Sequence, residues 1–231
     1  MLPSSSARIL DSLRDSDVVL DIGGGAAPFA RADWVIDILP FASRHVVAGE
    51  RFTEATWIAR DVCDREPLPF ERDSIGFVVC SHTLEDVRDP IWVCTEMMRI
   101  GKAGYIEVPS RLEEQSIGVH GPWSGWSHHR WLIDVGPREI EFVHKSAVVH
   151  ARGRAHFPAG IAQRLTPEQR VQQLWWRDRF DVRERVLLDA PTLDAYLEDF
   201  VRERIGDVAV PRRQGLLRRL GQPRGRQRAV E

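Results

Sequence analysis

The sequence predicts an α/β fold with a mostly parallel sheet and helices on both faces of that sheet. Five short apolar segments, rich in β-branched and aromatic residues, alternate with turns and helical stretches over the first 110 residues, as parallel strands typically do. A run of three glycines, Gly23 to Gly25, follows the first of these segments. Open parallel sheets bind ligands beyond the carboxyl ends of their strands, where these glycines are expected to lie.

Local patterns predict each element of the first half. Ile9, Leu10 and Leu13 share one side of a short helix, expected over residues 4–13. A second helix is expected between Asp89 and Gly101, because an Asp-Pro pair caps its start and a glycine follows its last apolar residue. The five strands are expected at residues 17–22, 33–38, 56–62, 75–82 and 104–109.

The second half is less regular and is expected to contribute antiparallel strands. Residues 130–146 predict a hairpin around a Gly-Pro pair. Residues 166–169 read Thr-Pro-Glu-Gln, a capping box that predicts a helix with Val171, Leu174 and Trp175 on one face. A further strand is expected at residues 180–188, and an amphipathic helix at residues 193–201.

The charge distribution separates a basic tail from an acidic body. The net charge is −2, but residues 211–231 carry seven arginines and one acid, so this tail is +6 and the remaining 210 residues are −8. We expect residues 1–210 to form one domain, with residues 110–129 as a substrate lid within it, and residues 211–231 to be a disordered, solvated tail. Weak attraction of the tail to anionic lipid, to RNA or to the acidic body is the alternative, and no specific nucleic-acid binding is expected.

The composition is that of an ordinary globular protein, with 43% hydrophobic and 29% charged residues. No apolar run approaches the roughly 20 residues that cross a bilayer, and the first 13 residues are too polar for a signal peptide. The three cysteines, Cys63, Cys80 and Cys94, lack the close spacing of a metal site. We therefore expect reduced thiols in a cytoplasmic protein.

The distance from the glycine run to the next acid restricts the ligand. A dinucleotide motif needs G-x-G-x-x-G at the start of a full helix and an acid about 20 residues later. Here Pro28 stands at the third glycine position, and Asp37 follows Gly25 by only 12 residues, which reduces the first helix to about one turn. A diphosphate would lose the helix N-terminus that serves as its anion site. The pattern therefore favours a ligand that needs close backbone approach but no phosphate cradle.

Four segments of the first half carry a resemblance to a known family. They are "LDIGGG", the acid Asp37 at the end of the second strand, "ARDVCDREPLPFERDSIGFVVCSHTLEDVRDP" and "GKAGYIEVPS". In this order they resemble class I S-adenosylmethionine-dependent methyltransferases, in particular the branch called type 11, over about residues 15–110. The resemblance implies a Rossmann-like fold, S-adenosylmethionine as cofactor, and methyl transfer as the reaction.

The resemblance also implies which residues bind the cofactor. They are Asp21, Gly23, Gly25, Asp37, Asp61, Val62 and Ser81. The two glycines and the first acid would meet the methionine part, and Asp37 would accept hydrogen bonds from the two ribose hydroxyls. Asp61 and Val62 would lie beside the adenine, while Ser81 and His82 would border the sulfonium and the acceptor.

Three features depart from the pattern of that family. The usual acid that opens the fourth strand is Gly76, the usual histidine of the L-E-H-V motif is Asp86, and the first helix is truncated. A non-catalytic module that binds S-adenosylmethionine or a sugar is therefore the alternative function. A NAD-dependent oxidoreductase is a more distant alternative, disfavoured by Pro28 and the short first crossover.

Residues 118–131, "GVHGPWSGWSHHRW", hold three tryptophans and three histidines. One interpretation is a lid that packs on the core, and a second is an acceptor pocket in which tryptophan rings stack on a sugar or another flat ligand. A third is a metal site formed by His120, His128 and His129, which would need a turn because adjacent side chains of an extended chain point to opposite faces. We expect a lid that closes over the acceptor and holds no metal.

The predicted reaction is O-methylation of a small-molecule or glycan-type acceptor, whose identity the sequence leaves open. A hydroxyl acceptor needs a base, and a histidine of near-neutral pKa is suited to that role. The candidate catalytic residues are His82, His128 and His129. The candidate substrate-binding residues are Trp123, Trp126, Trp131 and Glu107, of which Glu107 is also a carboxylate alternative to the histidine base.

Overall fold

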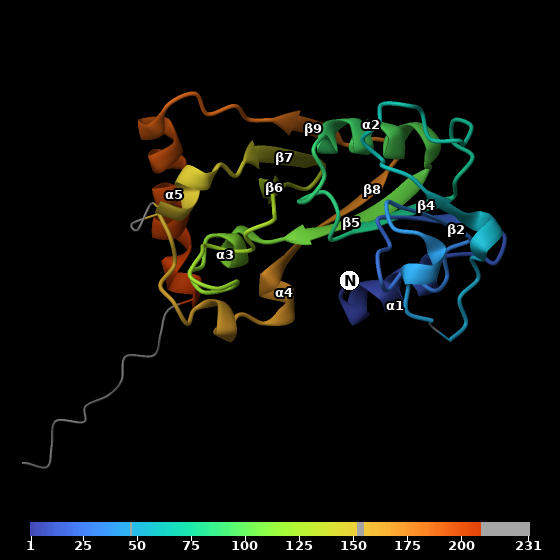
Figure 1. Ribbon diagram of the computed structural model, residues 1–231, viewed down its shortest axis with the longest axis horizontal. Coiled ribbons are helices and arrows are strands. Elements are labelled where there is room, and N and C mark those ends of the chain that lie inside the picture. The colour runs from blue at the N-terminus through green and yellow to red at the C-terminus, as the bar shows by residue number, and fades with distance from the viewer. Residues whose placement is uncertain (47, 152–154, 209–231) are drawn as a thin grey trace, which may run out of the picture.

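A six-stranded sheet forms the centre of the described chain, which in this computed structural model comprises residues 1–208 without 47 and 152–154 (Figure 1). The strand order is β3-β2-β1-β4-β5-β8, with β8 antiparallel to β5 and all other pairs parallel. The strands are β1 (Val19–Ile22), β2 (Trp34–Asp37), β3 (Trp57–Ala59), β4 (Phe77–Ser81), β5 (Ala103–Pro109) and β8 (Val171–Arg177). This topology confirms the predicted mostly parallel α/β sheet and places its switch point between β1 and β4.

Two helices cover opposite faces of the sheet, as predicted (Figure 1). Helix α1 (Pro3–Ser12) buries Ile9 against the strand residues of one face. Helix α2 (Pro90–Ile100) buries Met97 and its apolar neighbours against the other face. The α2 cap is the predicted one, because the Asp89 carboxylate accepts a hydrogen bond of 3.0 Å from the backbone N–H of Trp92. Residues 24–33, between β1 and β2, form turns and bends without a helix.

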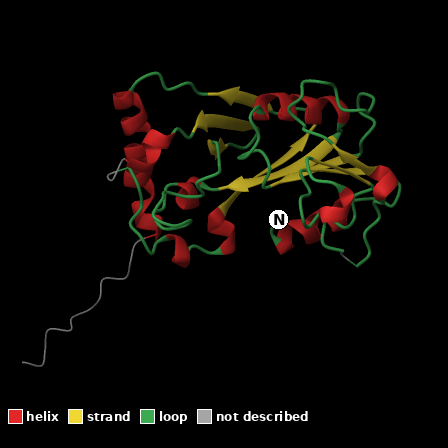
Figure 2. Cartoon of the chain, in the orientation of Figure 1, coloured by secondary structure: helices red, strands yellow, loops and turns green. Residues whose placement is uncertain are grey.

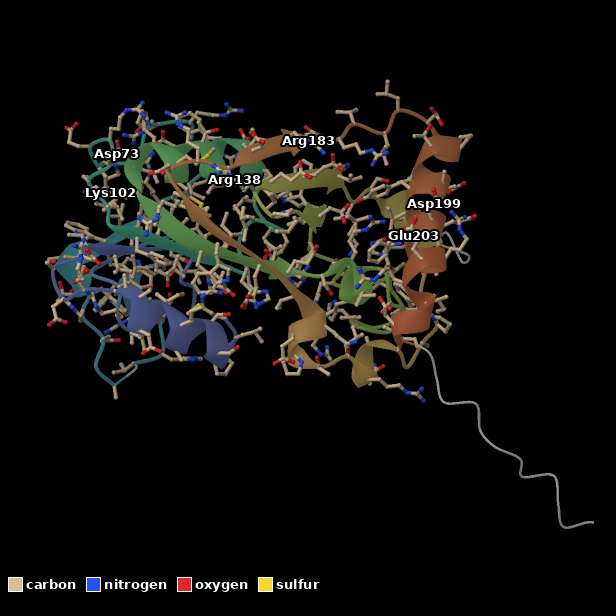
Figure 3. The ribbon with its side chains drawn as sticks, turned by 180° about the vertical axis from the view of Figure 1, so that it is seen from behind. Asp73, Lys102, Arg138, Arg183, Asp199 and Glu203 are labelled. Atoms are coloured by element: carbon tan, nitrogen blue, oxygen red, sulfur yellow. The ribbon has the colours of Figure 1, made fainter. Side chains whose placement is uncertain are left out.

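A small second sheet extends the molecule at the end remote from β3 (Figure 2). The predicted hairpin is confirmed as β6 (Trp131–Val135) and β7 (Glu139–His144), and β9 (Asp181–Glu184) pairs in parallel with β7. Helix α5 (Ala190–Arg204) packs on this sheet through Tyr196 and Leu197. Figure 3 shows Asp199 and Glu203 of α5 at one end of the molecule and Asp73 and Lys102 at the other. Helix α3 (Arg111–Glu114) directly follows β5.

The prediction for residues 166–177 is wrong in part. The capping box at Thr166 and Gln169 is present, but it opens only α4 (Pro167–Arg170). The expected helical residues 171, 174 and 175 belong instead to β8, which pairs with the whole length of β5. The alternation that buries Leu174 and Trp176 suits a strand, and the open edge of β5 offers it a full set of backbone hydrogen bonds.

Two further expectations concern the chain as a whole. The basic tail at residues 211–231 lies outside the described residues, so its predicted disorder stays a prediction, as does the division into a domain, a lid and a tail. Among the described residues, no helix combines the length and the apolar character needed to cross a bilayer.

Candidate active site

The glycine run forms a tight turn at the carboxyl end of β1. Gly23 and Gly25 adopt φ angles of 74° and 56°, which favour glycine. A Cβ on Gly23 would lie 2.1 Å from Oγ1 of Thr83, so the backbone of β1 and the loop after β4 approach as closely as the side chains allow. The N–H of Gly23 donates to the carbonyl oxygen of Ile36 at 2.7 Å and thereby ties the turn to β2.

Two buried acids hold the backbone on either side of this turn. Oδ2 of Asp21 accepts from the N–H of Phe29 at 2.8 Å. The two oxygens of Asp37 accept from Leu39 and Gly25, both at 2.7 Å. Burial raises the pKa of Asp21 to about 6, although the Phe29 hydrogen bond opposes the shift and the nearby Asp37 adds to it. A cationic ligand group beside Asp21 would therefore favour its ionised form.

A first cavity of about 540 Å³ lies between helix α1, the glycine turn and the end of β4. Asp21, Gly23, Ser81 and His82, four of the predicted site residues, line it together. The other predicted cofactor residues are absent from its wall, namely Gly25, Asp37, Asp61 and Val62. The structure thus gathers the residues expected at the methionine and sulfonium end of a cofactor and leaves those expected at its ribose and adenine end outside the cavity.

Asp61, the acid expected beside an adenine, is occupied by a neighbouring arginine. Its Oδ1 accepts from the N–H of Cys63 at 2.8 Å, and its Oδ2 pairs with the Arg88 guanidinium. Burial alone would raise the pKa of Asp61, but these two partners lower it. Val62 packs against the core cluster beneath α2. An amine that binds Asp61 would therefore displace or share the Arg88 contact.

His82 lies directly after β4, between two buried carboxylates. Its Nε2 is 3.3 Å from Glu107 and its Nδ1 is 3.4 Å from Glu85, and it has a left-handed φ of 54°. Hydrogen bonds to Glu107 and Glu85 raise the pKa of His82 to about 9, despite partial burial. At neutral pH His82 is therefore an imidazolium that donates hydrogen bonds, which argues against its predicted role as a base.

Glu107, the second candidate for the base, is a structural acid. It is 1% exposed, lines neither cavity, and accepts from the Leu2 N–H and the Tyr105 hydroxyl. Burial alone would raise the pKa of Glu107, but its bonds with His82, Tyr105 and the Leu2 N–H lower it to about 2. A carboxylate with this pKa is a poor proton acceptor, and it instead positions His82, Ser81 and the start of α1.

The His82–Glu107 pair makes stability depend on pH. The stability that His82 contributes is complete below the unfolded histidine pKa near 6.5 and is lost as pH rises through its folded pKa of about 9. The stability that Glu107 contributes is complete above the unfolded glutamate pKa of 4.5 and is lost as pH falls through its folded pKa of about 2. We expect the wild-type free energy of unfolding in urea to fall by on the order of 1 kcal/mol toward alkaline pH, and His82→Gln to lack this fall. The figure is kept small because His82 is 43% exposed and solvent screens its ion pairs. The exposed His144→Gln variant should keep the wild-type decline, and an unchanged decline in His82→Gln would contradict the pairing.

A second cavity of about 310 Å³ adjoins the first through His82. Its walls come from the segment after β4, the end of β5, α3 and the tryptophan- and histidine-rich segment. The lining residues are His82, Glu85, Asp86, Pro109, Glu113, Trp126, His128 and His129. The structure therefore brings His128, His129 and Trp126 to a common wall, as the acceptor-pocket interpretation expects.

Two of the predicted substrate tryptophans lie elsewhere. Trp131 is buried in β6, packs on Phe142 and donates its indole N–H to the carbonyl oxygen of Val87 at 2.8 Å. Trp123 is 49% exposed and contacts the ring of His150 instead of the cavity. Trp131 packs in the hydrophobic core because successive side chains of β6 point to opposite faces, and its face meets that core. Of Trp123, Trp126 and Trp131, only Trp126 lines the cavity.

A buried ionic cluster fixes the segment that carries the histidines. Nδ1 of His129 is 2.8 Å from Oε1 of Glu114, and Nζ of Lys145 is 2.6 Å from Oε2 of the same carboxylate. Lys145 also donates to the carbonyl oxygen of Trp126 at 2.9 Å. Gly125 packs so closely that a Cβ there would lie 2.6 Å from the carbonyl oxygen of Glu114. These contacts hold residues 124–129 against α3.

Sequence reasoning missed the acids that complete the second cavity. Glu85 and Asp86 follow β4 in "HTLEDV", and acids just beyond the carboxyl end of a central strand were the available signal. Glu85 is 1% exposed, and its Oε2 has no hydrogen-bond partner among the described residues. A buried carboxylate oxygen of this kind is suited to bind or deprotonate a ligand.

Comparison with known proteins gives a fold-level likeness to methyltransferases over about half of the chain. No family model matches and no curated protein matches. Among solved structures, 47 chains match. They include a provisionally assigned methyltransferase of an antibiotic biosynthesis pathway from Anabaena variabilis, with 15% identity over 51% of this chain and 49% of that chain and a TM-score of 0.40.

Two further matches name the cofactor or the reaction. A SAM-dependent methyltransferase from Thermotoga maritima, described as a possible histamine N-methyltransferase, has 22% identity, coverage of 47% and 51%, and a TM-score of 0.33. Phosphoethanolamine N-methyltransferase 2 of Haemonchus contortus, in complex with S-adenosyl-L-methionine, has 20% identity, coverage of 46% and 27%, and a TM-score of 0.34. The chain spans about half the length of the first solved chains that it matches.

Proposed function

We propose that the protein is an S-adenosylmethionine-dependent methyltransferase that methylates an oxygen of a small-molecule or glycan-type acceptor. The observation that carries this proposal is the pair of cavities that meet at His82, one beside the glycine turn and one beside the tryptophan- and histidine-rich segment. A methyl donor in the first cavity would face an acceptor in the second. Proximity and orientation supply most of the acceleration in such a transfer.

The residues of the first cavity fit the methionine end of this cofactor. The turn at Gly23 lets the backbone approach a ligand closely, and Asp21 is a buried acid suited to a ligand ammonium group. Asp37 lies outside the wall of this cavity, but each of its oxygens keeps a lone pair beyond its one backbone hydrogen bond, so the carboxylate can still accept from a ribose diol. Bound S-adenosylmethionine would supply a methyl group made electrophilic by the cationic sulfur.

The second cavity offers a proton acceptor for a hydroxyl substrate. Oε2 of Glu85 is buried without a partner among the described residues, so we assign to it the hydroxyl proton that is released as the oxygen–methyl bond forms and the sulfur–methyl bond breaks. The neighbouring imidazolium of His82 would hold Glu85 in place through its Nδ1. Trp126 would supply a flat apolar surface for a sugar or ring.

Calorimetry with the purified chain tests the cofactor assignment. We expect micromolar binding of S-adenosylmethionine or S-adenosylhomocysteine and negligible binding of NAD, because residues 24–33 provide no helix N-terminus for a diphosphate. Asp37→Ala should weaken this binding by about 1–3 kcal/mol through lost charge-assisted hydrogen bonds. The control is Asp199→Ala, which removes an exposed acid of α5 that lines neither cavity. Equal affinities in Asp37→Ala and the wild type would remove the ribose assignment.

A further inference from the structure

Three side chains on the wall of the second cavity form a cluster with the composition of a metal site. The ligand atoms of Asp86, His128 and His129 all lie within 4.8 Å of one another. Asp86 comes from the segment after β4, and the histidines come from the segment before β6. Ligands about 2.1 Å from one ion are roughly 3.0–3.5 Å apart, so a shift of about 1 Å would complete the site. Asp86 and His128 are exposed side chains that can make this shift.

His129 is the fixed member of the cluster and is oriented as a metal ligand would be. Its Nδ1 faces Oε1 of Glu114 at 2.8 Å, so the tautomer that donates this hydrogen bond leaves a lone pair on Nε2. Metal-bound histidines commonly donate their other nitrogen to a carboxylate in this way. Lys145 holds that carboxylate from the far side, so the ring of His129 is positioned before any ion binds.

A turn brings the two adjacent histidines to the same side. Extended chain would place His128 and His129 on opposite faces, but residues 127 and 128 lie in a turn that follows Gly125, whose φ is 59°. The rings of the two histidines are 4.6 Å apart between centroids. His120, which the sequence offered as the third ligand, contacts Ser127 instead, and Asp86 takes its place.

The charges around the cluster favour a cation. The carboxylates of Glu85, Asp86 and Glu113 line the same cavity, and His82 is the imidazolium on its wall. Arg170 pairs with Glu113 at 2.7 Å, which leaves an acidic excess near Glu85 and Asp86. The unpartnered Oε2 of Glu85 is an independent sign that this cavity receives a ligand. A divalent ion bound by the three clustered side chains would offset the acidic excess.

We propose that Asp86, His128 and His129 bind a divalent first-row transition-metal ion, with Zn²⁺ as the ion that best suits two imidazoles and one carboxylate. Three protein ligands leave coordination positions open toward the cavity. This proposal differs from the sequence-based expectation that the segment holds no metal. If the protein transfers methyl groups as proposed above, an oxygen of the acceptor would occupy an open position, where the ion would lower the pKa of a hydroxyl and orient it. This role of the ion in activating the acceptor rests on the proposed function, whereas the metal site itself does not.

Metal binding to the full-length chain tests the site directly. After chelator treatment and dialysis, the protein is titrated with Co²⁺ and with Zn²⁺ by calorimetry, and the visible absorption of bound Co²⁺ is recorded. We expect one ion per chain and a Co²⁺ spectrum of low coordination number. His128→Ala and Asp86→Asn should each weaken binding by at least about tenfold, the least that loss of even an outer partner costs. Both side chains are exposed, so circular dichroism should show folded variants.

His120→Ala tests the ligand set, because His120 is an exposed histidine that packs on the rings of Trp126 and His128 without belonging to the cluster. The exposed His144→Ala is the control outside the segment. His144→Ala should bind Co²⁺ with wild-type affinity, and His120→Ala should retain stoichiometric binding. Loss of binding in His120→Ala with retention in Asp86→Asn would overturn the proposed ligand set in favour of three histidines. Absence of stoichiometric binding at millimolar Co²⁺ and Zn²⁺, or equal binding by all variants, would overturn the site itself.

Cofactor binding measured in the presence of chelator separates this proposal from the proposed function. S-adenosylmethionine should still bind when chelator is present, since none of the three ligands lines the first cavity. Metal binding without cofactor binding would leave the site intact and remove the methyltransferase assignment. Cofactor binding without metal binding would remove the metal site and leave the methyltransferase assignment intact.

Discussion

Replacing Lys145 with methionine is expected to destabilise the protein by about 3–5 kcal/mol. The Lys145 side chain is fully buried and Glu114 is 1% exposed, so the substitution leaves a buried carboxylate that has lost its ammonium partner. Methionine keeps a similar length and apolar stem, which isolates the loss of charge. The carbonyl oxygen of Trp126 also loses the hydrogen bond that Lys145 donates to it. Urea unfolding at pH 7 measures the total loss of stability.

Two further variants separate this charge effect from general disruption. Adding Glu114→Gln to Lys145→Met removes the stranded charge and should recover part of the lost stability. Arg183→Met breaks an exposed pair with Glu141 and should cost no more than about 1 kcal/mol. A cost below about 1 kcal/mol for Lys145→Met would show that the cluster with Glu114 does not hold the histidine segment.

Replacing Gly23 with alanine is expected to cost about 3 kcal/mol of stability and to abolish binding in the first cavity. The left-handed φ of 74° accounts for about 1–2 kcal/mol, and the remainder comes from a Cβ placed 2.1 Å from Oγ1 of Thr83 and 2.7 Å from its Cβ. Thr83 cannot escape by rotation alone, because its own Cβ is part of the contact. Thermal unfolding and calorimetric titration with S-adenosylhomocysteine measure the two effects.

Gly49→Ala is the matched control for that substitution. Gly49 has a φ of 78°, but a Cβ there would meet nothing within 4 Å. It should therefore show the backbone strain alone, about 1–2 kcal/mol, and bind the ligand normally. Equal stabilities of Gly23→Ala and Gly49→Ala would mean that the contact with Thr83 relaxes without cost and that the turn is not held by it.

Local patterns predicted most of the main sheet because each strand carries its own signal. The β-branched runs before Asp21 and Asp37, and the cap at Asp89, act within a few residues of the chain. The local pattern was misleading for residues 171–177, because the spacing of Val171, Leu174 and Trp175 fits a helical face although these residues form a strand. The open edge of β5 decided between them, and a pairing partner more than 60 residues away leaves no local trace.

The candidate site was predictable only where it consists of strand ends. Asp21, Gly23, Ser81 and His82 meet because parallel strands end at one edge, and the first cavity unites them. The cluster of His129, Glu114 and Lys145 joins residues up to 31 positions apart through burial, which no spacing rule encodes. The protonation of His82 was likewise hidden, because it depends on Glu107 and Glu85 arriving on its two sides.

The position of His82 on the shared wall of both cavities has a thermodynamic consequence. A ligand that enters either cavity would change the hydration and the hydrogen bonds of the same imidazolium, so binding in the two cavities would be energetically linked. Linkage is reciprocal, so whatever factor the first ligand imposes on the affinity for the second, the second imposes on the first. A cationic ligand in the first cavity would favour release of the His82 proton. The number of protons taken up or released when one cavity is filled would then depend on whether the other cavity is already occupied.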